Sequence, residues 1–306
     1  MRISQAAQFE QHVNNQLSKS LGAIPVLFPI LRRLGVTQTI NSHCPGDQEV
    51  SHGTTVEILT LNRLMAPKPL YKVKEWMAET VLGDALDVGE EQMHDTRIGR
   101  TLDDLYPHLD AIWQDIAVQA VLAYDIDLRF IHYDITSVYF EGEYTESEKI
   151  DYGYSRDHRP DAKQVNLGVN VTSETGIPLG YRVLAGRTAD RTTPLENLKA
   201  LRALLDRPEL AECQRDFLLV SDRAMLGREV IAAYAGKQIR WLGPLNADES
   251  LRDVMRTISD EELKDHPLAY RPTNQPKDEP MRYHGVLRSA TIEYERKRVP
   301  IQVLVV

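Results

Sequence analysis

The strongest constraint in this sequence is a carboxylate in the middle of an apolar, strand-forming stretch. Residues 131–140 read IHYDITSVYF, so β-branched and aromatic residues lie on both sides of Asp134. Such residues favour strands and aspartate does not, which makes an aspartate inside this pattern informative. We therefore expect a half-buried strand that carries one carboxylate on its face.

A second apolar stretch delivers another carboxylate. Residues 216–221 read DFLLVS and predict a strand, and Asp222 follows directly at its carboxyl end. Each aspartate also has a plainer interpretation: Asp134 could pair with a neighbouring arginine, and Asp222 could cap a turn or helix. Only a fold that brings the two strands together favours a shared metal site over these alternatives.

The order of elements after residue 128 predicts such a fold. Strands are expected at 131–140, 164–172, 178–184, 216–221 and 238–242, with helices at 194–205 and 228–235. Thr193 and Pro194 are typical of a capped helix start. This β-β-β-α-β-α-β succession is that of an α/β ribonuclease-H-like mixed sheet, whose first and fourth strands are neighbours. Asp134 and Asp222 would then lie within reach of one ion.

The remaining sequence predicts two flanking parts. Residues 1–128 predict an all-helical domain, in which Ser51 or Thr54 can cap one helix. Residues 129–245 form the expected ribonuclease-H-like core. Residues 246–306 predict a helix up to residue 263, then a loop and two strands that begin a β-rich insertion, and the apolar ending suggests further residues after Val306. The amino-terminal helices are expected at 26–34, 54–65, 71–81, 96–106 and 110–124.

Composition excludes some classes of protein. With 306 residues, 42% hydrophobic and 26% charged, the chain is typical of globular proteins. Its longest apolar run, residues 23–31, is too short to span a bilayer, so we expect no membrane partner and a cytoplasmic location. Cys44 and Cys213 provide neither a disulfide framework nor a zinc motif. The formal net charge of −9 is no basic footprint, so DNA binding must come from local patches.

The paired aspartates indicate divalent-metal chemistry. Mg²⁺ and Mn²⁺ prefer oxygen ligands and retain several waters, so a few carboxylates on rigid strands can hold them. Two such ions about 4 Å apart can activate a water or 3′-hydroxyl and stabilise the leaving oxygen of a phosphodiester. This chemistry needs no covalent nucleophile, in agreement with a sequence that has no Gly-x-Ser-x-Gly elbow or Walker loop.

A polar segment after the first acidic strand mixes aromatic and basic residues. Such residues can stack on bases and contact phosphates, although exposed arginines on an acidic protein usually serve solubility and a histidine in a polar loop is usually only solvated. The candidates for DNA binding are Tyr152, Tyr154, Arg156, His158, Arg159 and Lys163.

These residues together resemble insertion-sequence transposases of the DDE type. The resemblance is carried by YDITSVYFEG at 133–142, YGYSRDHRPD at 152–161 with Gln164, and SDRAM at 221–225. Residues 52–76 are similar to the helical domain that precedes the catalytic core in one branch of that family.

The resemblance implies an enzyme that cuts double-stranded DNA at the ends of a mobile element and transfers the 3′ ends to a target. Asp134 and Asp222 match the first two acids of the DDE set, which holds two Mg²⁺ or Mn²⁺ ions when complete. The third acid, a glutamate on a helix after the β-rich insertion, is then absent from this chain. Glu261 and Glu262 would suit family members without the insertion. A homodimer on DNA is also implied.

Three interpretations stay open at this point. The first is a transposase that is incomplete in this chain. The second is a non-catalytic transposase remnant that binds DNA or the full-length enzyme. The third is a standalone metal-dependent nuclease that uses Glu261 or Glu262 as its third ligand.

Overall fold

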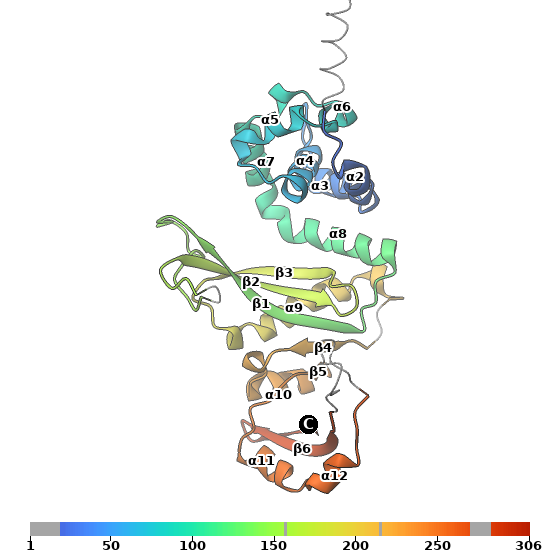
Figure 1. Cartoon of the computed structure of the whole chain (residues 1–306), viewed down its shortest axis with the longest axis vertical. Helices are drawn as coiled ribbons and strands as arrows, with labels where there is room; N and C mark the ends of the chain where they lie inside the picture. The colour runs from blue at the N-terminus through green and yellow to red at the C-terminus, as the bar shows by residue number, and fades with distance from the viewer. Residues whose placement is uncertain (1–18, 156–157, 214–215, 270–282) are drawn as a thin grey trace, which may run out of the picture. The chain divides into compact units, whose positions relative to one another are not determined.

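The chain folds into two compact units, Met1–Ile126 and Asp127–Val306. Each unit can be followed by its colour in Figure 1. No helix among the residues described here has the length and apolar character needed to cross a membrane. The structure, a computed structural model, describes residues 19–155, 158–213, 216–269 and 283–306.

The first unit is helical, as its sequence predicts. Its core is formed by buried apolar side chains, of which Ile58, Leu61 and Val73 have no exposed surface. Burial of this kind stabilises short helices that are marginal in isolation. The elements are α2 (Ile24–Arg33), α3 (Val36–His43), α4 (His52–Met65), η1 (Leu70–Lys72), α5 (Val73–Ala78), α6 (Leu82–Leu86), η2 (Glu90–Gln92), α7 (Asp95–Leu105), η3 (Tyr106–His108) and α8 (Leu109–Tyr124).

Helix α3 has no clear sign in the sequence, because its residues, VTQTINSH, are mostly poor helix formers. Tertiary contacts compensate. Val36 and Ile40 are buried in the core, and Asn41 Oδ1 accepts a hydrogen bond from the backbone N–H of Gly53 at 2.8 Å. The first turn of α4 therefore holds α3 in place.

The first turn of α4 also approaches the backbone of α3 closely. Ser51 is the N-cap, and its Oγ accepts a hydrogen bond from Thr54 N at 3.1 Å, one of the two caps that the sequence allows. A Cβ built on Gly53 would lie 2.3 Å from the backbone O of Thr37 and 2.8 Å from its Cα. Because these are backbone atoms, no side-chain movement can make room, and only glycine fits.

Substitution of two helical glycines should change stability in opposite directions. Gly53→Ala should lower the free energy of unfolding by about 2 kcal/mol or more, because the methyl group forces α3 and α4 apart. Gly99→Ala in α7, where an added Cβ meets nothing within 4 Å, should raise it by about 0.5–1 kcal/mol through helix propensity. Urea denaturation of both variants measures the difference, and equal shifts would contradict the close approach at Gly53.

The second unit contains a five-stranded sheet in the order β3-β2-β1-β4-β5. β1 and β2, and β2 and β3, pair antiparallel, whereas β1 and β4, and β4 and β5, pair parallel. The prediction that the first and fourth strands are neighbours is confirmed. The elements are β1 (Phe130–Phe140), β2 (Lys163–Thr172), β3 (Pro178–Ala185), η4 (Asp190–Thr192), α9 (Pro194–Leu205), η5 (Pro208–Leu210), β4 (Leu218–Ser221), η6 (Arg223–Met225), α10 (Arg228–Gly236), β5 (Arg240–Leu242), α11 (Glu249–Arg256), α12 (Asp260–Lys264), β6 (Val286–Tyr294) and β7 (Lys297–Val305).

The sheet has one buried face and one open face. Along β1 the odd-numbered residues Ile131 to Ser137 are buried, and α9 covers this face through a reciprocal pair of amide hydrogen bonds between Asn170 and Asn197, at 2.7 and 2.9 Å. The opposite face carries the even-numbered residues. Four apolar side chains on this second face are at least 40% exposed, namely Phe130, Val138, Val183 and Leu242.

The last part of the unit is a helix pair and a hairpin. The expected helix over 246–263 is wrong as a single element, because Ser259 Oγ accepts a hydrogen bond from Glu262 N and starts α12 after a break. β6 and β7 turn at Glu295 and Arg296, both at positive φ, as in a type I′ hairpin. Residues 246–306 lie in the same compact unit as the sheet, and their division into core and insertion stays a prediction.

Candidate functional site

The two predicted aspartates follow the last paired residues of neighbouring parallel strands. β1 and β4 pair from Phe130 with Leu218 up to Tyr133 with Ser221, so Asp134 and Asp222 occupy the next position on each strand. Tyr133 and Ser221 are buried, whereas both aspartates are exposed. Because side chains alternate along extended backbone, both carboxylates point to the open face, about one strand spacing of 4.8 Å apart at their backbones.

Each carboxylate is positioned by the backbone of the next residue. Asp134 Oδ1 accepts a hydrogen bond from Ile135 N at 2.7 Å, and Asp222 Oδ1 accepts one from Arg223 N at 2.6 Å. Within the described segments, no lysine, arginine or histidine forms an ion pair with either aspartate, so an arginine partner for Asp134 is not observed. Asp222 also fits its alternative interpretation as a cap, because it stands at the N-cap of η6.

A second group of contacts, on the buried face of the sheet, fixes the position of β1. The Tyr133 hydroxyl donates a hydrogen bond to Thr193 Oγ1 at 3.0 Å, and Gly168 on β2 leaves the space that its ring needs, because a Cβ there would lie 2.8 Å from the hydroxyl oxygen. Thr193 stands at the start of α9, as predicted. Its side chain makes no capping bond and donates instead to Asp190 O, so the expected role as a side-chain cap is wrong.

His132 shares the face of Asp134 but is engaged elsewhere. Its Nε2 lies 3.2 Å from Ser173 Oγ, at the end of β2. This contact agrees with the structural interpretation of a strand histidine.

The predicted DNA-binding residues are only partly brought together. Lys163 Nζ donates a hydrogen bond to Glu143 O and lies 5.9 Å from the centre of the exposed Tyr152 ring. Lys163 pairs with Phe140, six residues along β1 from Asp134, which places it about 20 Å from that carboxylate. These residues therefore form a separate patch at the far end of the β1–β2 ribbon.

The arginine and histidine of this segment are less available than expected. Arg159 donates hydrogen bonds to both carboxylate oxygens of Asp161 and lies over the ring of Tyr139 at 5.1 Å. This guanidinium holds the pKa of Asp161 below its usual range. His158 is exposed at a positive φ of 55°, and Arg156 lies outside the described residues.

Tyr154 connects this segment to the end of β4. It is 84% exposed, and its carbonyl accepts a hydrogen bond from the Gln164 amide at 3.0 Å. It lines a hollow of about 380 Å³ together with Ala224, two residues after Asp222, and with Arg191. An exposed tyrosine and a cation thus lie beside the carboxyl end of β4.

Sequence patterns missed the residue that shapes this hollow. Asn166 is 3% exposed, and its amide donates hydrogen bonds to the carbonyls of Gly186 and Thr188. The sequence gives no sign of it, because the alternation of β2 predicts burial of its odd-numbered valines and leucine, whereas the structure buries the even-numbered residues, Asn166 among them.

The alternative third acids are placed on α12. The carboxylate of Glu262 forms an ion pair with Arg288 on β6. The described ranges contain no group of three or more aspartate, glutamate, histidine or cysteine side chains arranged to hold a metal ion. The two aspartates are thus brought together in this part of the chain, but neither Glu261 nor Glu262 joins them.

Comparison with known families gives one match, in the helical unit. Residues 16–118 match the family described as "Domain of unknown function (DUF4277)". No curated protein matches the chain. The family covers about a third of the chain and assigns no activity to it.

Several solved structures of transposases resemble the chain remotely. The Mos1 transposase paired-end complex with left transposon end has 12% sequence identity and a TM-score of 0.28, over 71% of this chain and 75% of that chain. The catalytic domain of Mos1 mariner transposase has 16% identity and a TM-score of 0.27, over 51% and 76%. The piggyBac transposase synaptic complex with hairpin DNA has 15% identity and a TM-score of 0.34, over 89% and 51%.

Two buried tyrosines beneath the candidate site allow a matched test of stability. Tyr133→Phe should lower the free energy of unfolding by about 1 kcal/mol, because it removes the hydrogen bond to Thr193. Tyr234 in α10 is fully buried, and its hydroxyl has no hydrogen-bond partner among the described residues. Tyr234→Phe should therefore raise the free energy of unfolding by about 1 kcal/mol. Urea denaturation would contradict this account if both variants shifted in the same direction.

Proposed function

We propose that this chain is a transposase of the DDE type, which binds double-stranded DNA and uses Asp134 and Asp222 to hold Mg²⁺ or Mn²⁺ for phosphodiester cleavage and strand transfer. The observation that carries the proposal is the parallel register of β1 and β4. It brings two carboxylates from distant parts of the sequence to equivalent positions on one open face.

The topology of the sheet supports the proposal. Three antiparallel strands are followed by two parallel strands that are added on the other side of β1, in the order expected of a ribonuclease-H-like core. One acid lies within the central strand and the other follows the strand beside it. This is the placement of the first two acids that the sequence motifs imply.

The donor set fits a hard divalent ion. Two exposed carboxylates on adjacent strands offer oxygen ligands, and open water can complete the coordination of Mg²⁺ or Mn²⁺. When bound, such ions activate a water or 3′-hydroxyl and stabilise the leaving oxygen of the phosphodiester. The chain's own contribution is rigidity, because strand pairing and the N–H groups of Ile135 and Arg223 hold both carboxylates in place. The second ion of a complete site calls for a third carboxylate.

The net charge of −9 opposes DNA binding, so the proposal depends on local features of the surface. Tyr152 and Tyr154 expose aromatic rings that nothing in the core requires, and Lys163 and Arg191 add cations near them. Exposed aromatic rings beside cations are suited to stacking on bases next to a charged backbone.

A second candidate is a DNA-binding protein that does not cleave. It is favoured by the observation that no third carboxylate joins the aspartate pair within the described ranges. A standalone nuclease that uses Glu262 is less compatible with the ion pair between this residue and Arg288.

The metal site is tested by substituting its two aspartates. Asp134→Asn and Asp222→Asn should each weaken Mn²⁺ binding, measured by calorimetry, by at least about tenfold, because each removes one charged ligand. Asp216→Asn is the matched control, since Asp216 is an exposed aspartate two residues before the start of β4, away from the end that Asp222 follows. Wild-type affinity in the Asp134→Asn and Asp222→Asn proteins would contradict the proposal.

Nicking of supercoiled plasmid in Mn²⁺ separates the candidate functions. Nicking that is lost in Asp134→Asn and kept in Glu262→Gln supports the transposase site. Nicking that is lost in Glu262→Gln supports the standalone nuclease. Metal-independent DNA binding without any nicking supports the second candidate.

Removal of the most exposed aromatic ring should weaken DNA binding. Tyr154→Ala should reduce affinity for a duplex with a single-stranded overhang by about 1–3 kcal/mol, because the ring can stack on an unpaired base. Tyr71→Ala, an exposed tyrosine of the helical unit, is the control. Fluorescence anisotropy with a labelled duplex of this kind measures both, and equal affinities would exclude Tyr154 from the DNA interface.

A further inference from the structure

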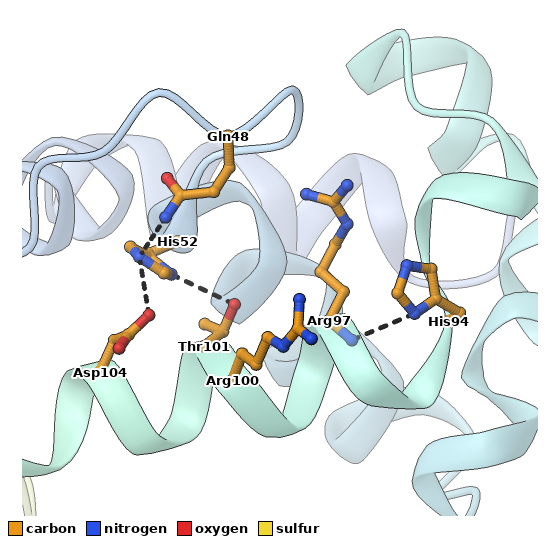
Figure 2. Close-up of a pocket in the computed structure, with 7 residues that line it drawn as sticks. All are labelled: Gln48, His52, His94, Arg97, Arg100, Thr101 and Asp104. Atoms are coloured by element: carbon orange, nitrogen blue, oxygen red, sulfur yellow. Dashed lines mark hydrogen bonds and ion pairs between the residues drawn. The ribbon is translucent and has the colours of Figure 1, made fainter.

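The helical unit contains a hollow of about 290 Å³ between the start of α4 and one face of α7. Figure 2 shows Arg97, Arg100, Thr101 and Asp104 along α7, opposite His52. No motif in the sequence indicates this hollow. Since one water occupies about 30 Å³ in the liquid, the space can hold a small polyatomic ion with part of its hydration shell.

Two arginines give one end of the hollow its charge. Arg97 and Arg100 are three residues apart on α7, so their side chains are neighbours on one face of the helix. Arg97 lies in the first turn, where the helix dipole disfavours cations. Neither forms an ion pair with a carboxylate in the described segments. Arg97 donates one long hydrogen bond, of 3.4 Å, to Val50 O, and its buried Nε has no partner there.

The remaining lining adds a hydrogen-bond donor and one acid, which is bound to His52. His94 Nδ1 accepts a hydrogen bond from Arg97 N at 3.1 Å, which leaves Nε2 as the protonated, donating nitrogen of the neutral ring. Asp104 lies 3.5 Å from His52 Nε2; along α7 it is two helical turns, about 10 Å, from Arg97 and one turn, about 6 Å, from Arg100, with which no ion pair is formed. Asp104 therefore lies at one end of the hollow, Arg97 at the other, and Arg100 between them, with neither guanidinium in an ion pair among the described residues.

His52 makes the acidic end rigid. It is 5% exposed, its Nδ1 lies 3.2 Å from Thr101 Oγ1, and its Nε2 lies 3.0 Å from the Gln48 amide. These contacts join the start of α4 and Gln48 in the loop before it to the middle of α7.

We propose that this hollow binds a phosphate group through Arg97 and Arg100, and that the group is a backbone phosphate of DNA. Guanidinium groups donate paired hydrogen bonds that match phosphate oxygens, and a phosphate can accept from both arginines at once. A bound anion removes the repulsion between the two cations and is also favoured by the helix dipole. The assignment to DNA rests on the proposed function and extends it, because it gives the helical unit a contact with the nucleic acid.

The test uses the full chain without divalent metal, so that it does not depend on the aspartate pair. Arg100→Gln removes one charge from an exposed side chain without a described partner, and Arg63→Gln does the same at the far end of α4. Two probes are used, a labelled 30-base-pair duplex and inorganic phosphate. We expect Arg100→Gln to bind both probes about tenfold more weakly than wild type. The slope of log affinity against log salt for the duplex should fall in magnitude by about 0.9.

The outcomes separate the sources of the phosphate. Weaker binding of both probes by Arg100→Gln, with Arg63→Gln unchanged, supports the proposal. Loss of inorganic phosphate binding alone overturns the assignment to DNA, and unchanged binding of both probes overturns the site. If Arg100→Gln weakens duplex binding and the wild-type chain shows no metal-dependent nicking, the cleavage proposal is refuted and the phosphate site is supported.

Discussion

Parallel hydrogen bonding between β1 and β4 is the interaction on which the rest of the second unit depends. Only four residue pairs form it, from Phe130 with Leu218 to Tyr133 with Ser221. Long antiparallel pairing with β2 already fixes β1 as a central strand. Addition of β4 on the other side then closes a long loop, at an entropic cost that burial must offset. The position of both carboxylates follows from this short contact.

Buried polar contacts hold α9 and the sheet in a single arrangement. The Tyr133 hydroxyl meets Thr193, and the Asn170 and Asn197 amides bond reciprocally, so α9 can cover the sheet in only one register without leaving polar groups unpaired. Gly168 leaves room for the tyrosine ring. The hydroxyl of Tyr234 lies under the same face without a described partner, and burial raises its pKa.

The sequence predicts the sheet better than the details around it. Alternation in residues 131–140 and 164–172, and the order of elements after residue 128, predict the strands and the adjacency of β1 and β4, because these depend on patterns within each segment. α3 escapes prediction, since its stability comes from the contact of Asn41 with Gly53 and from burial of Val36 and Ile40. Thr193 has the sequence pattern of an N-cap, but its hydroxyl accepts a hydrogen bond from Tyr133, 60 residues away, and makes no capping bond. The sequence also does not predict the hollow at Arg97 and Arg100, because His52 and Gln48 form its opposite wall only in the folded chain.

The open face around Asp134 has a further electrostatic consequence. With Val138, Val183 and Leu242 at least 40% exposed, the aspartate pair lies at a surface that water reaches. Two unit charges 4 Å apart interact by about 1 kcal/mol in water and by about 4 kcal/mol at the effective dielectric constant of a partly covered protein surface. The strength with which these carboxylates attract a cation is therefore set by whatever layer covers the sheet, and it increases when that layer displaces solvent.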